Sequence, residues 1–295
     1  MKDFEAAKEF FKDTVDPSFY FDSISAEIAR NNLKEAIGDP SIPLIFIIGD
    51  PGVGKSHIMR VMHYSSAVAA NSVLIEHPFF DPRDLFKELY EARGMPFDKN
   101  KTQGEFMDEL FEAYVGTLCT IFIDEAQLLN DDQFEFLRIL SDTKLFQFVL
   151  AMHKDEGMAL LAKKQFKTRS KLVIEYGNLD ENEILRYIHT LFMGHTHGEI
   201  AMMFSKNEAR VIARYAKGNF RMIKKFLYTL MKLLDYAQKK GLSKYRKLNS
   251  CLLTMAALDI GRVSAIPTIT DTTDPDPLAN SWTTVLFVLS TRKFR

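Results

Sequence analysis

The sequence predicts an α/β protein with a doubly wound, mainly parallel five-stranded core and a C-terminal all-helical domain. Two observations lead to this fold class. Up to Tyr176, five short apolar runs of the kind that a parallel sheet buries on both faces alternate with helical segments. After Tyr176 the strand signals stop and only helical periodicity remains. In such a core, ligands bind at the carboxyl ends of the strands, so the functional residues are expected there.

The elements follow from local patterns. The apolar runs predict strands at 43–49, 72–76, 118–123, 146–151 and 171–175. Helical spacing predicts core helices at 22–37, 56–63, 83–93, 104–114, 132–140 and 156–167, and later helices at 180–192, 206–216, 220–239 and 246–258. The predicted domains are a helical lead-in at 1–40, the α/β core at 41–177, the helical domain at 178–262, and a poorly ordered linker or tail at 263–295.

Composition narrows the class of protein. Lys and Arg total 38 against 39 Asp and Glu, which excludes a global basic field but leaves room for a local basic patch. Cys119 and Cys251 are far apart, which argues against a disulfide framework and a zinc site. The N-terminal residues contain no secretory signal pattern, and no apolar run approaches the ~20 residues of a membrane span. We expect a cytoplasmic protein without direct membrane insertion, which would reach the inner membrane through a partner.

The segment after the first predicted strand matches the phosphate-binding pattern GxxxxGK[ST]. Glycines let the backbone N–H groups turn toward phosphates, and the helix that follows adds its positive N-terminal end. Lys55 is expected to contact the β- and γ-phosphates of ATP, and Ser56 to bind Mg²⁺. The predicted nucleotide-binding residues of this P-loop are Gly49, Asp50, Pro51, Gly52, Val53, Gly54, Lys55, Ser56 and the adjoining His57.

Two acids end the third predicted strand, as the Walker B motif requires. Asp124 is expected to hold Mg²⁺, and Glu125 to orient and deprotonate the attacking water. Alone, this pair has a solvated strand end as its alternative. Paired with the P-loop upstream, it predicts a Mg²⁺-dependent ATP hydrolase.

Several motifs together resemble the ExeA-type AAA+ ATPases of bacterial general-secretion, pilus and DNA-uptake systems. The resemblance covers about residues 16–262 and includes the P-loop. The other matching segments are Asp16-Pro-Ser-Phe-Tyr20, Ile123-Asp-Glu-Ala-Gln127-Leu-Leu, Phe136-Leu-Arg-Ile-Leu-Ser141, Phe148-Val-Leu150 and Gly218-Asn-Phe-Arg221.

This resemblance implies roles for further residues. His153 matches the sensor-1 position, where the family more often has Gln; its alternative is a loop histidine. Arg169 matches an arginine finger that enters a neighbouring subunit's site, and its alternative is a cation at a helix end. Arg221 matches the sensor-2 arginine, and its alternative is a surface arginine. Phe19 and Tyr20 lie where stacking near adenine is expected, or they belong to the core.

The resemblance implies a homo-oligomer, a ring or a nucleotide-dependent assembly, that uses ATP to remodel or assemble a protein partner in a membrane-associated secretion, type IV pilus or transformation apparatus. Two alternatives stay open. One is a DNA-dependent ATPase like the TniB-type transposition regulators, which would have DNA as a partner. The other is a slow nucleotide switch whose output is the position of the helical domain.

Three other signals have plain interpretations. His195, His197 and Glu199 are interpreted as a polar loop rather than a metal cluster. The tail segment 282–289 is either a docking segment or unrelated to function. The helix at 220–239 and the residues after it are basic, which a solvated helix face explains; a contact with a phosphate backbone is the alternative. These basic residues are Lys224, Lys225, Lys232, Lys239, Lys240, Lys244, Arg246 and Lys247.

Overall fold

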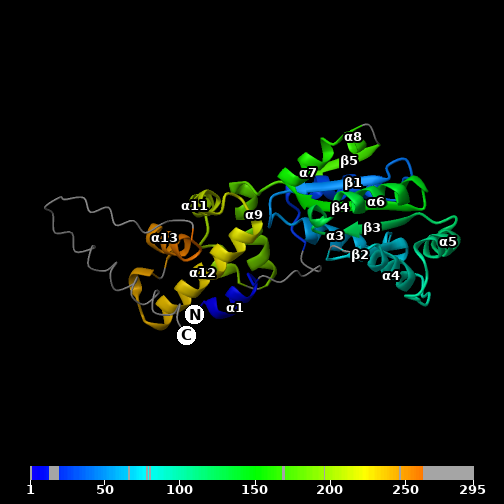
Figure 1. Ribbon diagram of the computed structural model, residues 1–295. Helices are drawn as coiled ribbons and strands as arrows, with labels where there is room; N and C mark the ends of the chain where they lie inside the picture. Colours follow the sequence, from blue (N-terminus) through cyan, green and yellow to red (C-terminus); the bar gives the residue numbers. More distant parts are fainter. Residues whose placement is uncertain are drawn as a thin grey trace. The chain divides into compact units, whose positions relative to one another are not determined.

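The computed structural model contains the predicted five-stranded sheet, and all its strands are parallel (Figure 1). It describes residues 2–12, 20–65, 67–77, 79, 81–167, 170–195, 197–245 and 247–261. The strand order is β2-β3-β4-β1-β5. The strands are β1 (Leu44–Gly49), β2 (Ser72–Ile75), β3 (Cys119–Ile123), β4 (Phe146–His153) and β5 (Lys171–Glu175).

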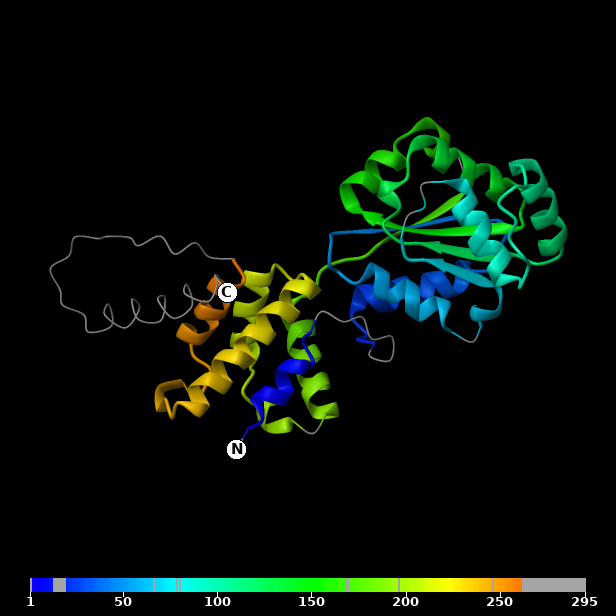
Figure 2. The same ribbon diagram turned by 60° about the horizontal axis from the view of Figure 1, so that its bottom comes forward.

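Burial explains why the strands are apolar throughout. Every residue of β1 and β3 is buried, and so is every residue of β4 except its last. Helices cover both faces of the sheet (Figure 2). One face packs against α2 (Ile24–Ala36) and α3 (Lys55–His63). The other packs against α4 (Pro82–Ala92), α5 (Gln103–Tyr114), α6 (Asp131–Asp142), α7 (Lys154–Leu161) and α8 (Lys164–Lys167). The doubly wound prediction is thereby confirmed.

A buried glutamine fixes the entry into β1. Gln147 is fully buried in β4, and its Nε2 donates to the carbonyl oxygens of Ala36, Asp39 and Ile42 at 2.8, 3.2 and 2.8 Å. Its Oε1 accepts a hydrogen bond from the backbone N–H of Gly38 at 3.1 Å. Because buried polar groups are costly when unpaired, these bonds fasten the loop between α2 and β1 to the sheet.

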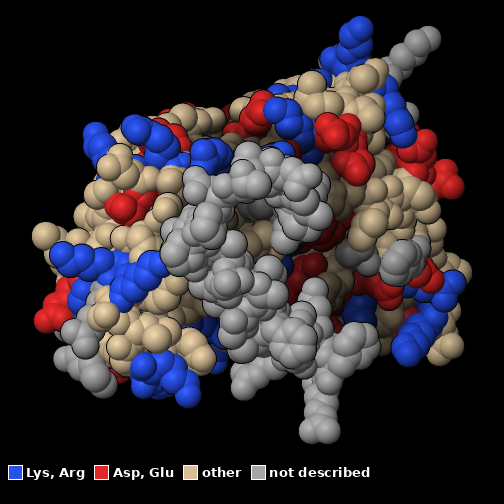
Figure 3. All heavy atoms as spheres, turned by 90° about the vertical axis from the view of Figure 1, so that its left-hand side faces the viewer, with Lys and Arg blue, Asp and Glu red and all other residues tan. Residues whose placement is uncertain are grey.

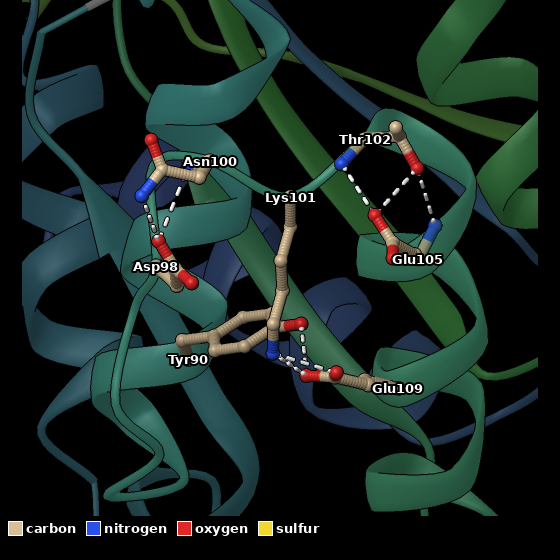
Figure 4. A network of polar contacts seen from close by, with 7 residues as sticks. All are labelled: Tyr90, Asp98, Asn100, Lys101, Thr102, Glu105 and Glu109. Carbon is tan, nitrogen blue, oxygen red and sulfur yellow. Dashed lines mark hydrogen bonds and ion pairs between the residues drawn. The ribbon is translucent and has the colours of Figure 1, made fainter.

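The loop before α5 is held by a polar network (Figure 4). The Nζ of Lys101 lies 2.6 and 2.7 Å from the two carboxylate oxygens of Glu109, and the Tyr90 hydroxyl donates to the same carboxylate at 2.8 Å. The Lys101 hydrogen bond, followed by that of Tyr90, lowers the pKa of Glu109. Thr102 and Glu105 form a capping box at the start of α5. This network joins α4 to α5 on one face of the sheet.

The second part of the chain is helical, as predicted. Its helices share one hydrophobic cluster with the N-terminal α1. They are α9 (Glu181–Gly194), α10 (Gly198–Ala201), α11 (Lys206–Ala216), α12 (Phe220–Lys239) and α13 (Ser250–Asp259), and α1 is Phe4–Glu9. The described residues also form short 3-10 turns, which are η1 (Ala69–Asn71), η2 (Ala126–Leu128) and η3 (Ser243–Tyr245). We call α9 to α13 the helical lid. No described helix combines the length and hydropathy that a membrane span requires.

Three local predictions differ from the structure. The helix predicted at 246–258 begins later, because the side chain of Asn249 caps α13 by accepting from the Leu252 N–H. The helix predicted at 156–167 is two helices, α7 and α8, and Leu160 from the first and Phe166 from the second enter the same cluster. The predicted helical lead-in at 1–40 contains two helices that pack in different clusters: α1 packs in the lid's cluster, and α2 packs on the sheet. The predicted tail at 263–295 lies outside the described residues.

Candidate functional site

The P-loop connects β1 to α3 through a backbone that requires glycine. Gly52 and Gly54 have φ angles of 82° and 120°, which side chains rarely tolerate. A Cβ on Gly49 would lie 2.4 Å from the carbonyl oxygen of Tyr176. Gly54 is the N-cap of α3 and provides no capping side chain, so the first turn of the helix keeps backbone donors for a ligand. The loop therefore has the backbone form of an anion cradle.

Lys55 fills this cradle. Its ammonium donates to the carbonyl oxygens of Gly49 and Asp50 at 2.9 and 3.0 Å, and the residue is only 8% exposed. Burial lowers the pKa of Lys55, while the negative charges of Glu125 and Asp124 act in the opposite direction. The ammonium and the carboxylates of Asp124 and Glu125 thus share one electrostatic environment.

The two acids sit at the carboxyl end of β3. The Asp124 N–H donates to the Ile75 carbonyl at 3.0 Å, which ties this end to β2. The side chain of Asp124 accepts from the Glu125 N–H at 2.9 Å. Glu125 has a φ of 49°, a left-handed conformation that is uncommon for a residue other than glycine. Backbone strain of this kind is often found at functional sites.

His153 ends β4, between the strands that carry the P-loop and the acids. It pairs in register with Gly49 on β1. Its Nε2 lies 3.5 Å from the Oε2 of Glu125, and its Nδ1 lies 3.9 Å from the Oε1 of Glu156. The Nε2 of Gln127 donates to the same Glu125 oxygen. The Glu125 carboxylate is therefore contacted by an imidazole and an amide.

The helical lid contacts the P-loop at main-chain atoms. The N–H of Arg221 donates to the carbonyl of Gly52 at 3.0 Å, and the side-chain amide of Asn219 donates to the carbonyl of Pro51 at 2.8 Å. Asn219 also caps α12, because its Oδ1 accepts from the Met222 N–H. The start of α12 is thus fixed against the loop, and the charge of Arg221 contributes to lowering the pKa of Lys55.

Aromatic side chains flank the loop. Tyr20 stacks on His57 with ring centroids 6.2 Å apart, and the Tyr176 ring would lie 3.5 Å from a Cβ on Gly54. Burial raises the pKa of both tyrosines. These rings provide an apolar wall beside the start of α3, and Phe19 lies outside the described residues.

Replacing Gly52 with alanine is expected to disturb the contact between the lid and the P-loop. The new Cβ would lie 2.8 Å from the Cβ of Arg221 and 3.1 Å from the Oδ1 of Asn219. Gly38 is the matched control, because its φ is also positive, at 90°, but nothing lies within 4 Å of its added Cβ. We expect Gly52→Ala to lower the free energy of unfolding by about 1–2 kcal/mol more than Gly38→Ala does. Urea unfolding measures both, and equal losses would contradict the predicted steric conflict.

The structure brings most of the predicted site residues together. Those assembled are the P-loop, His57, Asp124, Glu125, His153 and Arg221, whereas Arg169 lies outside the described residues. Sequence reasoning missed the contacts of Gln127, Asn178 and Asn219, although Gln127 stands two residues after Glu125 and Asn219 precedes the lid helix. Asn178 reaches the Asp50 carboxylate at 3.3 Å.

Comparisons with known proteins bear on the fold. Residues 42–156 match a protein-family model described as an AAA domain. The structure is similar to Cdc6p from Pyrobaculum aerophilum, with a TM-score of 0.59, 18% identity, and coverage of 79% of this chain and 66% of that one. It is also similar to Drosophila ORC bound to DNA, with a TM-score of 0.59, 15% identity and coverage of 86% and 65%. A third similar structure is the ORC2 protein of Aeropyrum pernix in ADPNP and ADP complexes, with a TM-score of 0.56, 13% identity and coverage of 86% and 72%. No curated protein sequence matches the chain.

At these identities the similar structures establish the fold alone. The parallel sheet, its flanking helices and the helical part that follows form the AAA+ fold. Within this fold, residues 42–156 are the part that matches the AAA domain.

Proposed function

We propose that this protein binds ATP with Mg²⁺ and hydrolyses it at the site formed by the P-loop, Asp124 and Glu125. The observation that carries the proposal is the buried Lys55 ammonium inside the glycine loop, in the electrostatic field of both acids. A cation within a loop of backbone donors suits a triphosphate. The Aeropyrum pernix protein of the same fold was solved with ADPNP and ADP, which supports nucleotide as the ligand.

The oxygen ligands at the site fit Mg²⁺. This ion is usually bound by one or two protein oxygens together with phosphates and waters, rather than by a full protein cage. Asp124 and Ser56 would supply those oxygens. Among the described residues, no group of three or more His, Cys, Asp or Glu side chains could hold a metal ion. The bound ion would neutralise charge on the phosphates.

The side chains at the strand ends then have distinct tasks. Glu125 would take a proton from the attacking water, because its carboxylate ends β3 beside Asp124. Gln127 and His153 contact this carboxylate and would orient it. Arg221 would respond to the γ-phosphate. Its N–H is bonded to Gly52, so a change in the loop would move the start of α12.

We further propose an oligomer in which Arg169 completes the site of a neighbouring subunit. The residue precedes β5, where the resemblance to ExeA-type ATPases implies an arginine finger. Mixing Glu125→Gln subunits with Arg169→Ala subunits should restore part of the ATP turnover that each variant lacks alone, because mixed assemblies contain some intact sites. The measurement is steady-state hydrolysis over a range of mixing ratios. If no mixing ratio restores turnover, the site is not shared between subunits. If the wild-type protein does not hydrolyse ATP under any assembly condition, the protein is not an ATPase.

The process served rests on the motif resemblance. That resemblance implies a cytoplasmic ATPase that remodels or assembles a bacterial secretion, type IV pilus or transformation apparatus, with contact to the inner membrane through its protein partner. The alternative is a DNA-dependent ATPase, and the described surface of the lid has a property that bears on this choice.

A further inference from the structure

The near-neutral charge of the whole chain conceals a strong separation of charge. Residues 178–261 contain 14 Lys and Arg against 7 Asp and Glu, a formal charge of +7. Residues 20–177 contain 17 against 24, a formal charge of −7. Such asymmetry within one chain indicates a polyanionic partner for the basic part. Figure 3 shows Lys and Arg side chains in several groups, with fewer Asp and Glu, on the left-hand half of the face that it presents.

The positive charge follows one line along α12. Lys225, Lys232 and Lys239 are seven residues apart, so they lie on the same side of the helix, and all three are exposed. At 1.5 Å per residue the line is about 21 Å long, long enough to lie along several nucleotides of a strand. Asp235 is the only acid of the helix, and it pairs with Lys239 at 2.7 Å. Lys225 and Lys232 have no carboxylate partner among the described residues.

A groove accompanies this line. Its volume is about 710 Å³, and its described lining includes Lys12, Lys225, Tyr228, Lys232 and Thr229. The Nζ of Lys232 lies 6.0 Å from the centre of the Tyr228 ring. Asp259 also lines the groove, and its carboxylate accepts a hydrogen bond from Thr229 at 3.1 Å. The lining also includes the apolar residues Phe11, Met222 and Ile260. Three lysines, two aromatic residues and one carboxylate thus line the groove.

We propose that this groove and the basic line of α12 bind a single strand of nucleic acid. The lysines would contact phosphates at intervals along the strand, and a base would stack on Tyr228, since single-strand sites combine a basic groove with aromatic side chains. A protein partner would instead rely on large exposed apolar side chains as anchors. The only large hydrophobic residue of α12 with an exposed side chain is Tyr236, which stacking would also suit. This site is separate from the nucleotide site and does not depend on ATP hydrolysis.

Binding of a labelled single-stranded DNA, followed by fluorescence anisotropy over a range of salt, tests the proposal. Wild-type affinity should fall steeply with salt. The double variant Lys225→Ala/Lys232→Ala should bind at least about tenfold more weakly, with a slope of log affinity against log salt that is shallower by about 1.4. Tyr228→Ala should lose roughly tenfold while Tyr228→Phe retains binding, because phenylalanine preserves the stacking surface.

The control is Lys34→Ala/Lys87→Ala, which removes two exposed lysines from the α/β core. It should bind DNA as the wild type does. ATP turnover without DNA should be unchanged in Lys225→Ala/Lys232→Ala, which separates failure of this proposal from failure of the ATPase. No binding by the wild type, equal losses in the control, or tighter binding to duplex DNA would overturn the single-strand site. Equally strong binding to polyglutamate or to phosphatidylglycerol vesicles would overturn it as well, in favour of an acidic protein or a membrane surface.

Discussion

Replacing Glu125 with glutamine is expected to reduce ATP turnover by a factor on the order of 10² or more, with little change in nucleotide affinity. Glutamine has the shape of glutamate but does not accept a proton at neutral pH. The Lys55 ammonium, which would hold the phosphates, forms its hydrogen bonds with the P-loop backbone and not with the Glu125 side chain. Steady-state hydrolysis and equilibrium binding of a fluorescent ATP analogue measure the two effects separately.

Glu156 offers a matched control for this substitution. Its carboxylate also lies near His153, at 3.9 Å from Nδ1, but on α7 rather than at the end of β3. Glu156→Gln removes the same charge from the same neighbourhood and should keep turnover within about twofold. If Glu125→Gln hydrolyses ATP normally, or if both variants lose activity equally, Glu125 is not the base.

Removing the Lys55 ammonium should weaken nucleotide binding by roughly 10- to 100-fold. Hydrogen bonds to charged groups contribute about 1.5–3 kcal/mol, and Lys55 is the only cation of the P-loop. Lys55→Met is the informative variant, because it retains the buried aliphatic stem. Lys55→Ala would remove both the stem and the charge. Titration with a fluorescent ATP analogue gives the affinity, and thermal unfolding without nucleotide checks that the loop still folds.

Lys154 is the control cation. It begins α7, is largely exposed and pairs with Glu175, so it belongs to the same end of the sheet without entering the loop. Lys154→Met should leave affinity within about twofold. Equal weakening by both substitutions would mean that general positive charge attracts the nucleotide, and that the position of Lys55 inside the loop is unimportant.

The sequence predicts the sheet well because its strands are buried on both faces. Each central strand is therefore a continuous apolar run, and its polar neighbours mark where the run ends. The same logic located Lys55 and the two acids, since parallel strands bring their carboxyl ends to one edge. Local spacing was sufficient there because each motif is contiguous in sequence.

The sequence patterns could not predict contacts between segments that are far apart in the chain. Gln147 looked like an ordinary member of an apolar strand, but its amide bonds a loop more than 100 residues earlier. The sequence indicates Asn219 as the start of a helix. Its hydrogen bond to the Pro51 carbonyl forms only when the lid is folded against the P-loop, so no local pattern predicts it. Helix α1 is too short to carry a periodic signal, so its association with the lid's cluster followed only from tertiary packing.

The bond between the Arg221 N–H and the Gly52 carbonyl has a further consequence, because both partners belong to the polypeptide backbone. Every amino acid except proline would supply the same donor at position 221. The backbone bond that links α12 to the P-loop and the guanidinium charge at position 221 can therefore change independently of each other. A homologous protein could keep the bond and have a side chain without this charge.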